Sequence, residues 1–308
     1  MVSAASLSTT APYFSVIIAI YNDWAPLHHC LQSIAEQTDA PNFEVIVVDD
    51  GSREIAPPFI ESYGEAFALT LVRQRHLGVA AARNCGAKIA KGPVLVFVDA
   101  DCKLEPNCLS ALGSTIADSP DHQSFQLRLT GDCSGLVGRA EELRLIALQA
   151  QMLQPNGCIR YLNTAGFAIR RENVNVEAGV FDPAALRSED TLLLANLMQH
   201  GELPLFVANA TVQHAISLSL MRCFLKDVRS AWLEAKTNHL IASKGVRIGT
   251  NRRERLAMVL SMWKSSRRHS IGRLAWLVVL AREGLGRLLF VACSRLGVHT
   301  SSHALVAF

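Results

Sequence analysis

An apolar run from Val94 to Val98 is followed by Asp99 and Asp101, and this stretch constrains the fold more than any other. A continuous apolar segment of strand length is typical of a parallel strand that is buried on both faces. Such a strand delivers the residues after it to the sheet edge where open α/β sheets bind ligands. Two carboxylates at one cleft repel each other unless a cation lies between them. The pattern therefore indicates either a divalent metal that carries a phosphorylated substrate, or simple acidic caps of the next helix.

The same strand closes a regular alternation of strands and helices. Compact β-branched runs predict strands, and apolar residues at helical spacing predict helices between them. The predicted strands are Phe14–Ile20, Phe43–Val48, Leu69–Arg73 and Val94–Val98, and the predicted helices are Leu27–Gln37 and Gly78–Lys91. Right-handed βαβ units follow from this order. The sequence thus predicts an α/β fold with a mostly parallel, Rossmann-like sheet flanked by helices.

Polar residues follow three of these strands, so the predicted sheet edge is rich in functional groups. They include Tyr21 after the first strand, Asp49 and Asp50 after the second, and Asp99 with Asp101. Arg83 lies one turn into a predicted helix, where a guanidinium can donate two parallel hydrogen bonds to a phosphate. Taken singly, each of these residues has an ordinary structural explanation as a turn, a cap or a solvated surface charge.

Four segments in order, FSVIIAIYN, VIVVDDGS, GVAAARN and VFVDAD, resemble the nucleotide-sugar-binding half of a family-2 glycosyltransferase with the GT-A fold. The resemblance covers roughly the first three quarters of the chain. It implies a nucleoside-diphosphate sugar as donor and a divalent metal, Mg²⁺ or Mn²⁺, as cofactor. It also implies the site residues: Ala19 and Tyr21 at the nucleoside, Asp50 on the base, Arg83 on the diphosphate, Asp99 on the ribose and Asp101 on the metal.

The second half of the chain is less regular. Its predicted elements are a helix at Glu141–Leu153, a strand with a small-residue turn at Tyr161–Arg171, a helix at Leu192–His200, and short extended pieces at Leu205–Val207 and Ala210–His214. Residues 113–137 give no clear pattern. Since acceptor-binding loops fall in this region, the sequence does not predict the acceptor.

The segment SEDTLLLANLMQHG resembles the family's acceptor-site signature, an acidic pair that heads a helix. The resemblance implies Asp190 as the general base, with Glu189 beside it in the acceptor pocket. A carboxylate in that place can take the proton of an acceptor hydroxyl as the glycosidic bond forms. Direct attack on the anomeric carbon predicts inversion. His214 matches a family histidine near the metal, although Asp190 could also be a helix cap and His214 a structural residue.

Cysteine usage bears on the compartment. The eight cysteines are scattered, with no CxxC pair and no zinc-like spacing, and no cleavable signal sequence is recognisable before the first strand. They are expected to be free thiols in a reducing cytoplasm.

The last 65 residues differ in charge from the rest. Residues 1–243 hold 18 Lys and Arg against 25 Asp and Glu, a net charge of −7, whereas residues 244–308 hold 12 against 2, a net charge of +10. A helix is predicted at Leu218–Leu240, followed by two or three amphipathic helices with apolar segments at Ile271–Leu280 and Leu285–Val291. We expect a catalytic domain over residues 12–240 and a helical tail over 241–308. Peripheral attachment to an anionic membrane is favoured slightly over packing on protein, and no nucleic-acid module is recognisable.

Together these features predict an inverting, metal-assisted glycosyltransferase that moves one sugar to a hydroxyl of a glycan or a lipid-linked acceptor. The absence of a Gln-x-x-Arg-Trp motif after His214 disfavours a processive synthase. Two alternatives stay open: a nucleotidyltransferase, disfavoured because no glycine-rich phosphate loop follows the first strand, and an inactive scaffold of a membrane complex.

Overall fold

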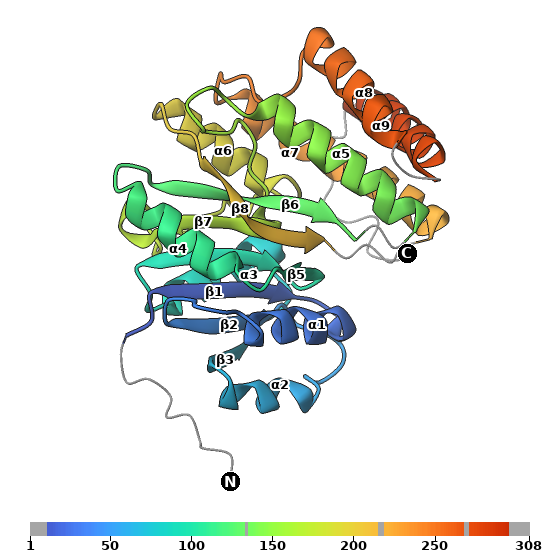
Figure 1. The fold of residues 1–308 in the computed structure, drawn as a ribbon. Coiled ribbons are helices and arrows are strands. Elements are labelled where there is room, and N and C mark those ends of the chain that lie inside the picture. The colour runs from blue at the N-terminus through green and yellow to red at the C-terminus, as the bar shows by residue number, and fades with distance from the viewer. Residues whose placement is uncertain (1–10, 133–134, 215–218, 268–270, 296–308) are drawn as a thin grey trace.

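The computed structural model describes residues 11–132, 135–214, 219–267 and 271–295 of the chain (Figure 1). The strands are β1 (Phe14–Ile20), β2 (Phe43–Asp49), β3 (Ala68–Arg73), β4 (Val94–Asp99), β5 (Cys102–Leu104), β6 (Ser124–Gly131), β7 (Phe167–Arg170) and β8 (Leu205–His214). The helices are α1 (Trp24–Ala35), α2 (Phe59–Ser62), α3 (Val79–Ile89), α4 (Cys108–Asp118), α5 (Leu136–Met152), α6 (Glu189–Gln199), α7 (Leu220–Ala242), α8 (Arg252–Ser266) and α9 (Gly272–Arg295).

The described strands form one sheet in the order β3-β2-β1-β4-β7-β6-β8-β5. The pairs among β1 to β4 are parallel, as is β6 with β8, while β7 is antiparallel to both of its neighbours and β5 is antiparallel to β8. In this register Ala19 lies opposite Asp99. The carboxyl ends of β1, β2 and β4 therefore meet at one edge, as the sequence predicts.

Helices cover both faces of the sheet. In β1, Val16 and Ile18 face a core shared with α1 and α4, whereas Ile17 faces a second core shared with α3 and α6. The second contact is close, because a Cβ on Gly86 of α3 would lie 2.5 Å from the Ile17 side chain. A small residue at this position thus lets α3 and its Arg83 pack tightly against the sheet.

Helices α5, α8 and α9 form a further layer beyond β6 and β8 (Figure 1). Their shared apolar cluster contains Ala140, Leu143 and Ala147 of α5, Met262 of α8, and Ala275 and Val279 of α9. The tail accordingly packs on the rest of the chain, the alternative that the sequence leaves open. Two helices, α8 and α9, follow α7 in the described residues, as the sequence predicts, and α9 holds both apolar segments together with Arg282, Glu283 and Gly284 between them. A glycine inside a helix costs only about 1 kcal/mol, which packing against α5 and α7 offsets.

The structure differs from the sequence-based expectation in two further segments, residues 113–137 and 205–214. Residues 113–137, which show no pattern, contain the end of α4 and all of β6. The two extended pieces between Leu205 and His214 are one strand, β8, whose pairing with β6 shifts register between Leu127 and Arg128. Because β6 and β8 lie inside the sheet, their pairing depends on contacts that are distant in sequence.

Arg282 connects α9 to α7 and α5 through charged side chains. Its guanidinium donates two hydrogen bonds, of 2.7 and 2.9 Å, to Asp227 of α7 and lies 3.7 Å from a carboxylate oxygen of Glu141 on α5. Replacing Arg282 by Met leaves both carboxylates without this partner, so we expect a loss of about 2–4 kcal/mol in the free energy of unfolding. Urea denaturation followed by circular dichroism measures it.

Arg287→Met is the matched control for this prediction. That arginine is 55% exposed in its side chain and lies 3.8 Å from Glu283 on the same helix, so its loss is expected to cost under about 0.5 kcal/mol. Equal stability of the two variants would contradict the anchoring role of Arg282.

The described cysteines are free thiols, and Cys133 lies outside the described residues. Within the part of the chain that the structure describes, none of the helices is both long enough and apolar enough to span a bilayer.

Candidate active site

The carboxyl ends of β1 and β4 open into a cavity of about 1130 Å³. Of the residues singled out from the sequence, it is lined by Ala19, Tyr21, Arg83, Asp99, Asp101, Glu189, Asp190 and His214. Asp50 is not among the lining residues. One cavity thus collects acidic, basic and aromatic groups from α3, α6 and three strand ends, which lie far apart in sequence.

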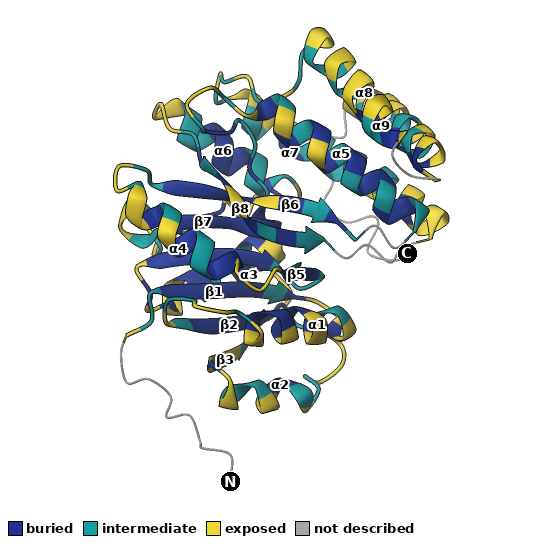
Figure 2. Cartoon of the chain, in the orientation of Figure 1, coloured by how far each residue is buried: buried dark blue, intermediate teal, exposed yellow. Residues whose placement is uncertain are grey.

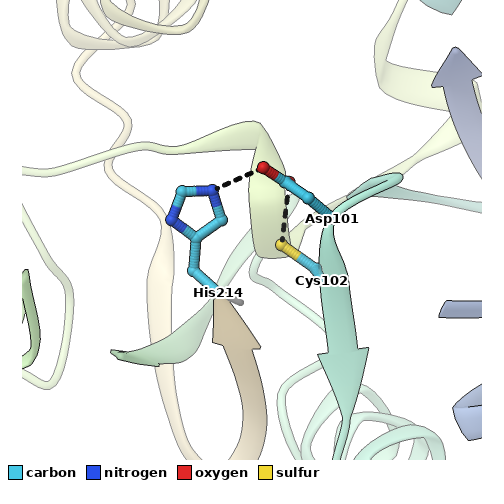
Figure 3. Close-up of side chains that lie close together, drawn as sticks. All are labelled: Asp101, Cys102 and His214. Atoms are coloured by element: carbon cyan, nitrogen blue, oxygen red, sulfur yellow. Dashed lines mark hydrogen bonds and ion pairs between the residues drawn. The ribbon is translucent and has the colours of Figure 1, made fainter. Parts of the chain in front are cut away.

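Asp101 and His214 form the group in this cavity that could hold a metal (Figure 3). The Nε2 atom of His214, at the end of β8, lies 3.3 Å from a carboxylate oxygen of Asp101, just after β4. Burial opposes ionisation, but the hydrogen bond with Asp101 raises the pKa of His214, and that hydrogen bond together with the charges of His214 and Lys226 lowers the pKa of Asp101. A divalent cation would take the place of the imidazole proton between the two side chains.

Cys102 completes the same cluster, yet its chemistry differs. Its sulfur lies 3.9 Å from Asp101 Oδ1, and the residue is 1% exposed. Burial raises the pKa of the Cys102 thiol far above its ordinary value, so the thiolate that a metal needs is not favoured. The donors that suit a divalent cation here are therefore the Asp101 carboxylate and the His214 imidazole, with room for diphosphate oxygens in the open cavity, and their role as metal ligands stays a prediction.

Arg83 bridges two carboxylates from different elements. Its guanidinium donates hydrogen bonds to Asp99 at 2.6 Å and to Glu189 at 2.5 Å, and the residue is only 3% exposed. The observed partners are thus protein carboxylates, so that contact with a diphosphate stays a prediction. The ion triad ties the start of α6, which carries Asp190, to the end of β4.

Asp190 lies in the first turn of α6, where Ser188 turns the chain with a left-handed φ of 63°. Such a φ is strained for a residue other than glycine. Ser188 makes no side-chain cap, while Asp190 Oδ1 accepts a hydrogen bond of 2.6 Å from the Thr191 amide. Burial and the charge of Glu189 raise the pKa of Asp190 to about 7. A carboxylate with that pKa is well matched to accept a proton near neutral pH.

Asp50 organises the loop before α3. Its carboxylate accepts four hydrogen bonds, from the side chains of Gln74 and His76 and from the amides of Leu77 and Gly78, at 2.7 to 2.9 Å. The His76 ring in turn stacks on Tyr21 with a centroid distance of 4.1 Å. The predicted base contact of Asp50 stays a prediction, but the residue clearly fixes the position of the aromatic pair beside the cavity.

Sequence reasoning misses the residues that close the cavity from the far side. These residues belong to α5, α7 and α9, and they include Glu141, Arg144, Lys226, Asp227, Glu234, Arg282 and Arg287. Burial opposes the effect, but Arg144 and Arg282 lower the pKa of Glu141 to about 2. The signals in the sequence are only scattered charges on amphipathic helices, which do not reveal that α9 reaches the site.

The family model described as glycosyl transferase family 2 matches residues 15–175, which is just over half of the chain. The chain belongs to glycosyl transferase family 2. The resemblance inferred from the four sequence segments is thereby confirmed.

Curated members of the family match only in part. The putative glycosyltransferase EpsH of Bacillus subtilis (strain 168) is 32% identical over 111 residues, which cover 36% of this chain and 32% of EpsH. Validoxylamine A glucosyltransferase of Streptomyces hygroscopicus subsp. limoneus is 44% identical over 91 residues, 29% of this chain and 20% of that protein. The chain thus matches a third or less of the length of these relatives.

One solved structure resembles nearly the whole chain. The mannosyltransferase PcManGT from Pyrobaculum calidifontis, in complex with GDP-Man and Mn²⁺, aligns with a TM-score of 0.59 and 17% identity. The alignment covers 95% of this family-2 chain and 83% of PcManGT. This likeness confirms the predicted α/β fold of the GT-A type, with a curled sheet flanked by helices.

Proposed function

We propose that this family-2 protein is an inverting glycosyltransferase that transfers one sugar from a nucleoside-diphosphate sugar to an acceptor hydroxyl. The observation that carries the proposal is that one cavity is lined both by the neighbouring pair Asp101 and His214 and by Asp190. A metal-binding pair and a carboxylate with a raised pKa are the two groups that such a transfer needs. The nucleotidyltransferase and scaffold alternatives do not account for Asp190.

The donor half of the proposal uses the strand ends. Asp101 and His214 would hold Mg²⁺ or Mn²⁺, which offsets the negative charge that develops on the departing diphosphate when it is bound. Tyr21, whose ring stacks on His76, would contact the nucleoside together with Ala19. The Asp99 side chain is 33% exposed and can accept a hydrogen bond from a ribose hydroxyl. Asp50 would contact the base and Arg83 the diphosphate. In support, PcManGT binds GDP-Man together with Mn²⁺.

The acceptor half depends on Asp190, with Glu189 beside it. An acceptor hydroxyl next to Asp190 loses its proton to the carboxylate while its oxygen bonds to the anomeric carbon. The nucleoside diphosphate leaves from the opposite face with the bonding electron pair, so the anomeric configuration inverts. The half-buried carboxylate, with its raised pKa, is matched to accept this proton near neutral pH.

The proposal is tested with a panel of UDP-, GDP- and dTDP-sugars and purified protein in Mn²⁺. Release of nucleoside diphosphate from one donor, with a product of inverted anomeric configuration by NMR, is the expected result. Release of pyrophosphate instead would indicate nucleotidyl transfer. No turnover of any donor by folded protein would favour the scaffold.

The tail helices also support peripheral contact with an anionic membrane at the cytoplasmic face. Leu256, Leu260 and Trp263 lie on one stripe of α8, and Leu274, Leu277 and Leu288 on one stripe of α9, all at least 37% exposed. Arg273 lies over the Trp263 ring at 5.6 Å, which brings basic and apolar groups together between the two helices. Figure 2 shows the exposed residues on the outer side of this layer. Such a surface suits shallow insertion among anionic lipids.

We expect the protein to sediment with vesicles of anionic phosphatidylglycerol, and less so as salt rises. Replacing Leu274 and Leu277 by Glu is expected to weaken binding at least about tenfold, because apolar burial and charge attraction are both lost. Ile55→Glu, at the 85% exposed Ile55 near α2, is the control and should bind like the parent. Unchanged binding of the double variant would place any membrane contact elsewhere.

A further inference from the structure

A second cavity, of about 870 Å³, lies between α5, α6, α7, α8 and α9. Its size is within the range of pockets that hold small organic ligands. Apolar side chains from all five helices line it, including Leu148, Leu194, Ile241, Met258 and Leu280, and charged side chains such as Arg160 and Arg247 lie among them. We call this cavity the tail chamber. Among its apolar lining residues, Phe290 also lines the active-site cavity, whereas the others do not.

The tail chamber adjoins the active-site cavity at Asp190. Eight residues line both cavities, namely Arg144, Ser188, Asp190, Thr191, Glu234, Glu283, Arg287 and Phe290. The metal-binding pair lines the active-site cavity alone. Asp190 therefore lies at a junction, with the donor groups on one side and an apolar chamber on the other.

Polar groups at this junction suit a hydroxyl-bearing head group. Burial raises the pKa of the Glu234 carboxyl, and Glu283 and Arg287 lie 3.8 Å apart on α9. Carboxylates accept hydrogen bonds from hydroxyl groups, and the guanidinium donates them. A molecule whose hydroxyl meets Asp190 would thus have polar partners close by and apolar side chains beyond them.

We propose that the tail chamber binds a hydrocarbon group of the acceptor, so that the preferred acceptor is a hydroxyl compound with a hydrocarbon chain rather than a free sugar. This inference rests on the proposed function, since it takes Asp190 as the base. Each methylene that leaves water for an apolar wall is favourable. The tail is then part of the catalytic unit, because α8 and α9 supply a wall of the acceptor site.

The test uses alkyl β-D-glucosides below their micelle concentration, titrated calorimetrically into the full chain. Methyl, hexyl and octyl glucoside share every hydroxyl and differ only in the hydrocarbon. Affinity is expected to rise about two- to fourfold with each methylene. Equal affinity of the methyl and octyl compounds, or no binding of either, would overturn the proposal.

Gly284 of α9 allows the chamber to be filled from within the helix. It lines the chamber, and a Cβ added there meets no atom within 4 Å. Gly284→Phe is expected to lower octyl glucoside affinity at least about tenfold, because the added ring takes the space of the chain. Ala281→Phe is the matched control, since the exposed Ala281 lines neither cavity. Equal octyl glucoside binding by the two variants would contradict the proposal. It would indicate that the octyl group binds instead to the exposed apolar stripe of α9 formed by Leu274, Leu277 and Leu288.

Nucleoside-diphosphate binding, measured on the same samples, separates the two proposals. If a nucleotide binds but glucoside affinity does not depend on the length of the alkyl group, the tail-chamber proposal is refuted and the glycosyltransferase proposal stays intact. Chain-length dependence that Gly284→Phe abolishes, without nucleotide binding, supports the chamber as a ligand site and counts against the donor site.

Discussion

Replacing Asp190 by Asn is expected to lower turnover by about 10²- to 10⁴-fold while nucleotide affinity stays within about twofold of the parent. The amide keeps the size of the side chain but cannot take the acceptor proton. Burial and the neighbouring Glu189 raise the pKa of Asp190 to about 7, so the parent's kcat/KM should rise with pH up to about 7 and then level off. Single-turnover transfer assays across pH 5–9 measure both effects.

Stability gives an independent control on the Asp190 variant. Since the pKa of Asp190 is raised in the folded protein, the folded state binds the proton more tightly than the unfolded chain does. The stability that protonated Asp190 contributes to the folded protein therefore declines as pH rises from about 4 to about 7. At pH 8 the Asn variant should unfold at a higher temperature than the parent, with a smaller difference at pH 5. If the Asn variant were inactive and also less stable than the parent at pH 8, its loss of activity would be due to misfolding, which would contradict the role of Asp190 as the general base.

Replacing Arg83 by Met is expected to destabilise the protein by about 3–5 kcal/mol. Arg83 is 3% exposed and its guanidinium donates hydrogen bonds to both Asp99 and Glu189, so its removal leaves two carboxylates close together without a cation. Burying such uncompensated charge is among the largest effects that a single substitution produces. Denaturant unfolding of the parent and the variant measures the loss.

Two further variants make this prediction specific. Arg53→Met removes an exposed arginine and should change stability by under about 0.5 kcal/mol. Adding Glu189→Gln to Arg83→Met removes one of the orphaned charges, so the double variant should be more stable than Arg83→Met alone. If Arg83→Met were as stable as Arg53→Met, the ion triad would not hold α6 against β4.

The place of most donor-side residues in the fold could be predicted from the sequence because they lie at the ends of strands, whereas their roles come from the family resemblance. The strands are short apolar runs with clear ends, and parallel strands bring their carboxyl ends to one edge. Ala19, Tyr21, Asp99 and Asp101 are therefore placed as soon as the strands are. His214 also lies at the end of a strand, although the sequence predicts two short extended pieces where the structure has the single strand β8.

Partners within the site could not be predicted in the same way. The sequence indicates Arg83 as a phosphate ligand, whereas in the structure Asp99 and Glu189, 16 and 106 residues away, accept its hydrogen bonds. Asp50 likewise holds His76 and the loop before α3. Which of several nearby groups a charged side chain contacts depends on packing distances of a few tenths of an ångström, and residue spacing carries no such information.

The tail shows the same limit on a larger scale. Its charge and amphipathic pattern predict helices, but the pattern alone does not distinguish a face that meets lipid from one that meets protein. In the structure Ala275 and Val279 pack on α5 while Leu274 and Leu277 are exposed, so both kinds of face occur on one helix. The tail chamber between these helices depends on that packing.

Calorimetric titration with UDP, GDP and dTDP, each in Mn²⁺ and in EDTA, tests the central claim most directly. We expect one nucleotide to bind in Mn²⁺ and at least about tenfold more weakly in EDTA, and Asp101→Asn to remove this metal dependence. His214→Gln should weaken it in the same direction. Failure of all three nucleotides to bind folded protein, or equal binding in Mn²⁺ and EDTA, would contradict a metal-dependent nucleotide-sugar site at Asp101.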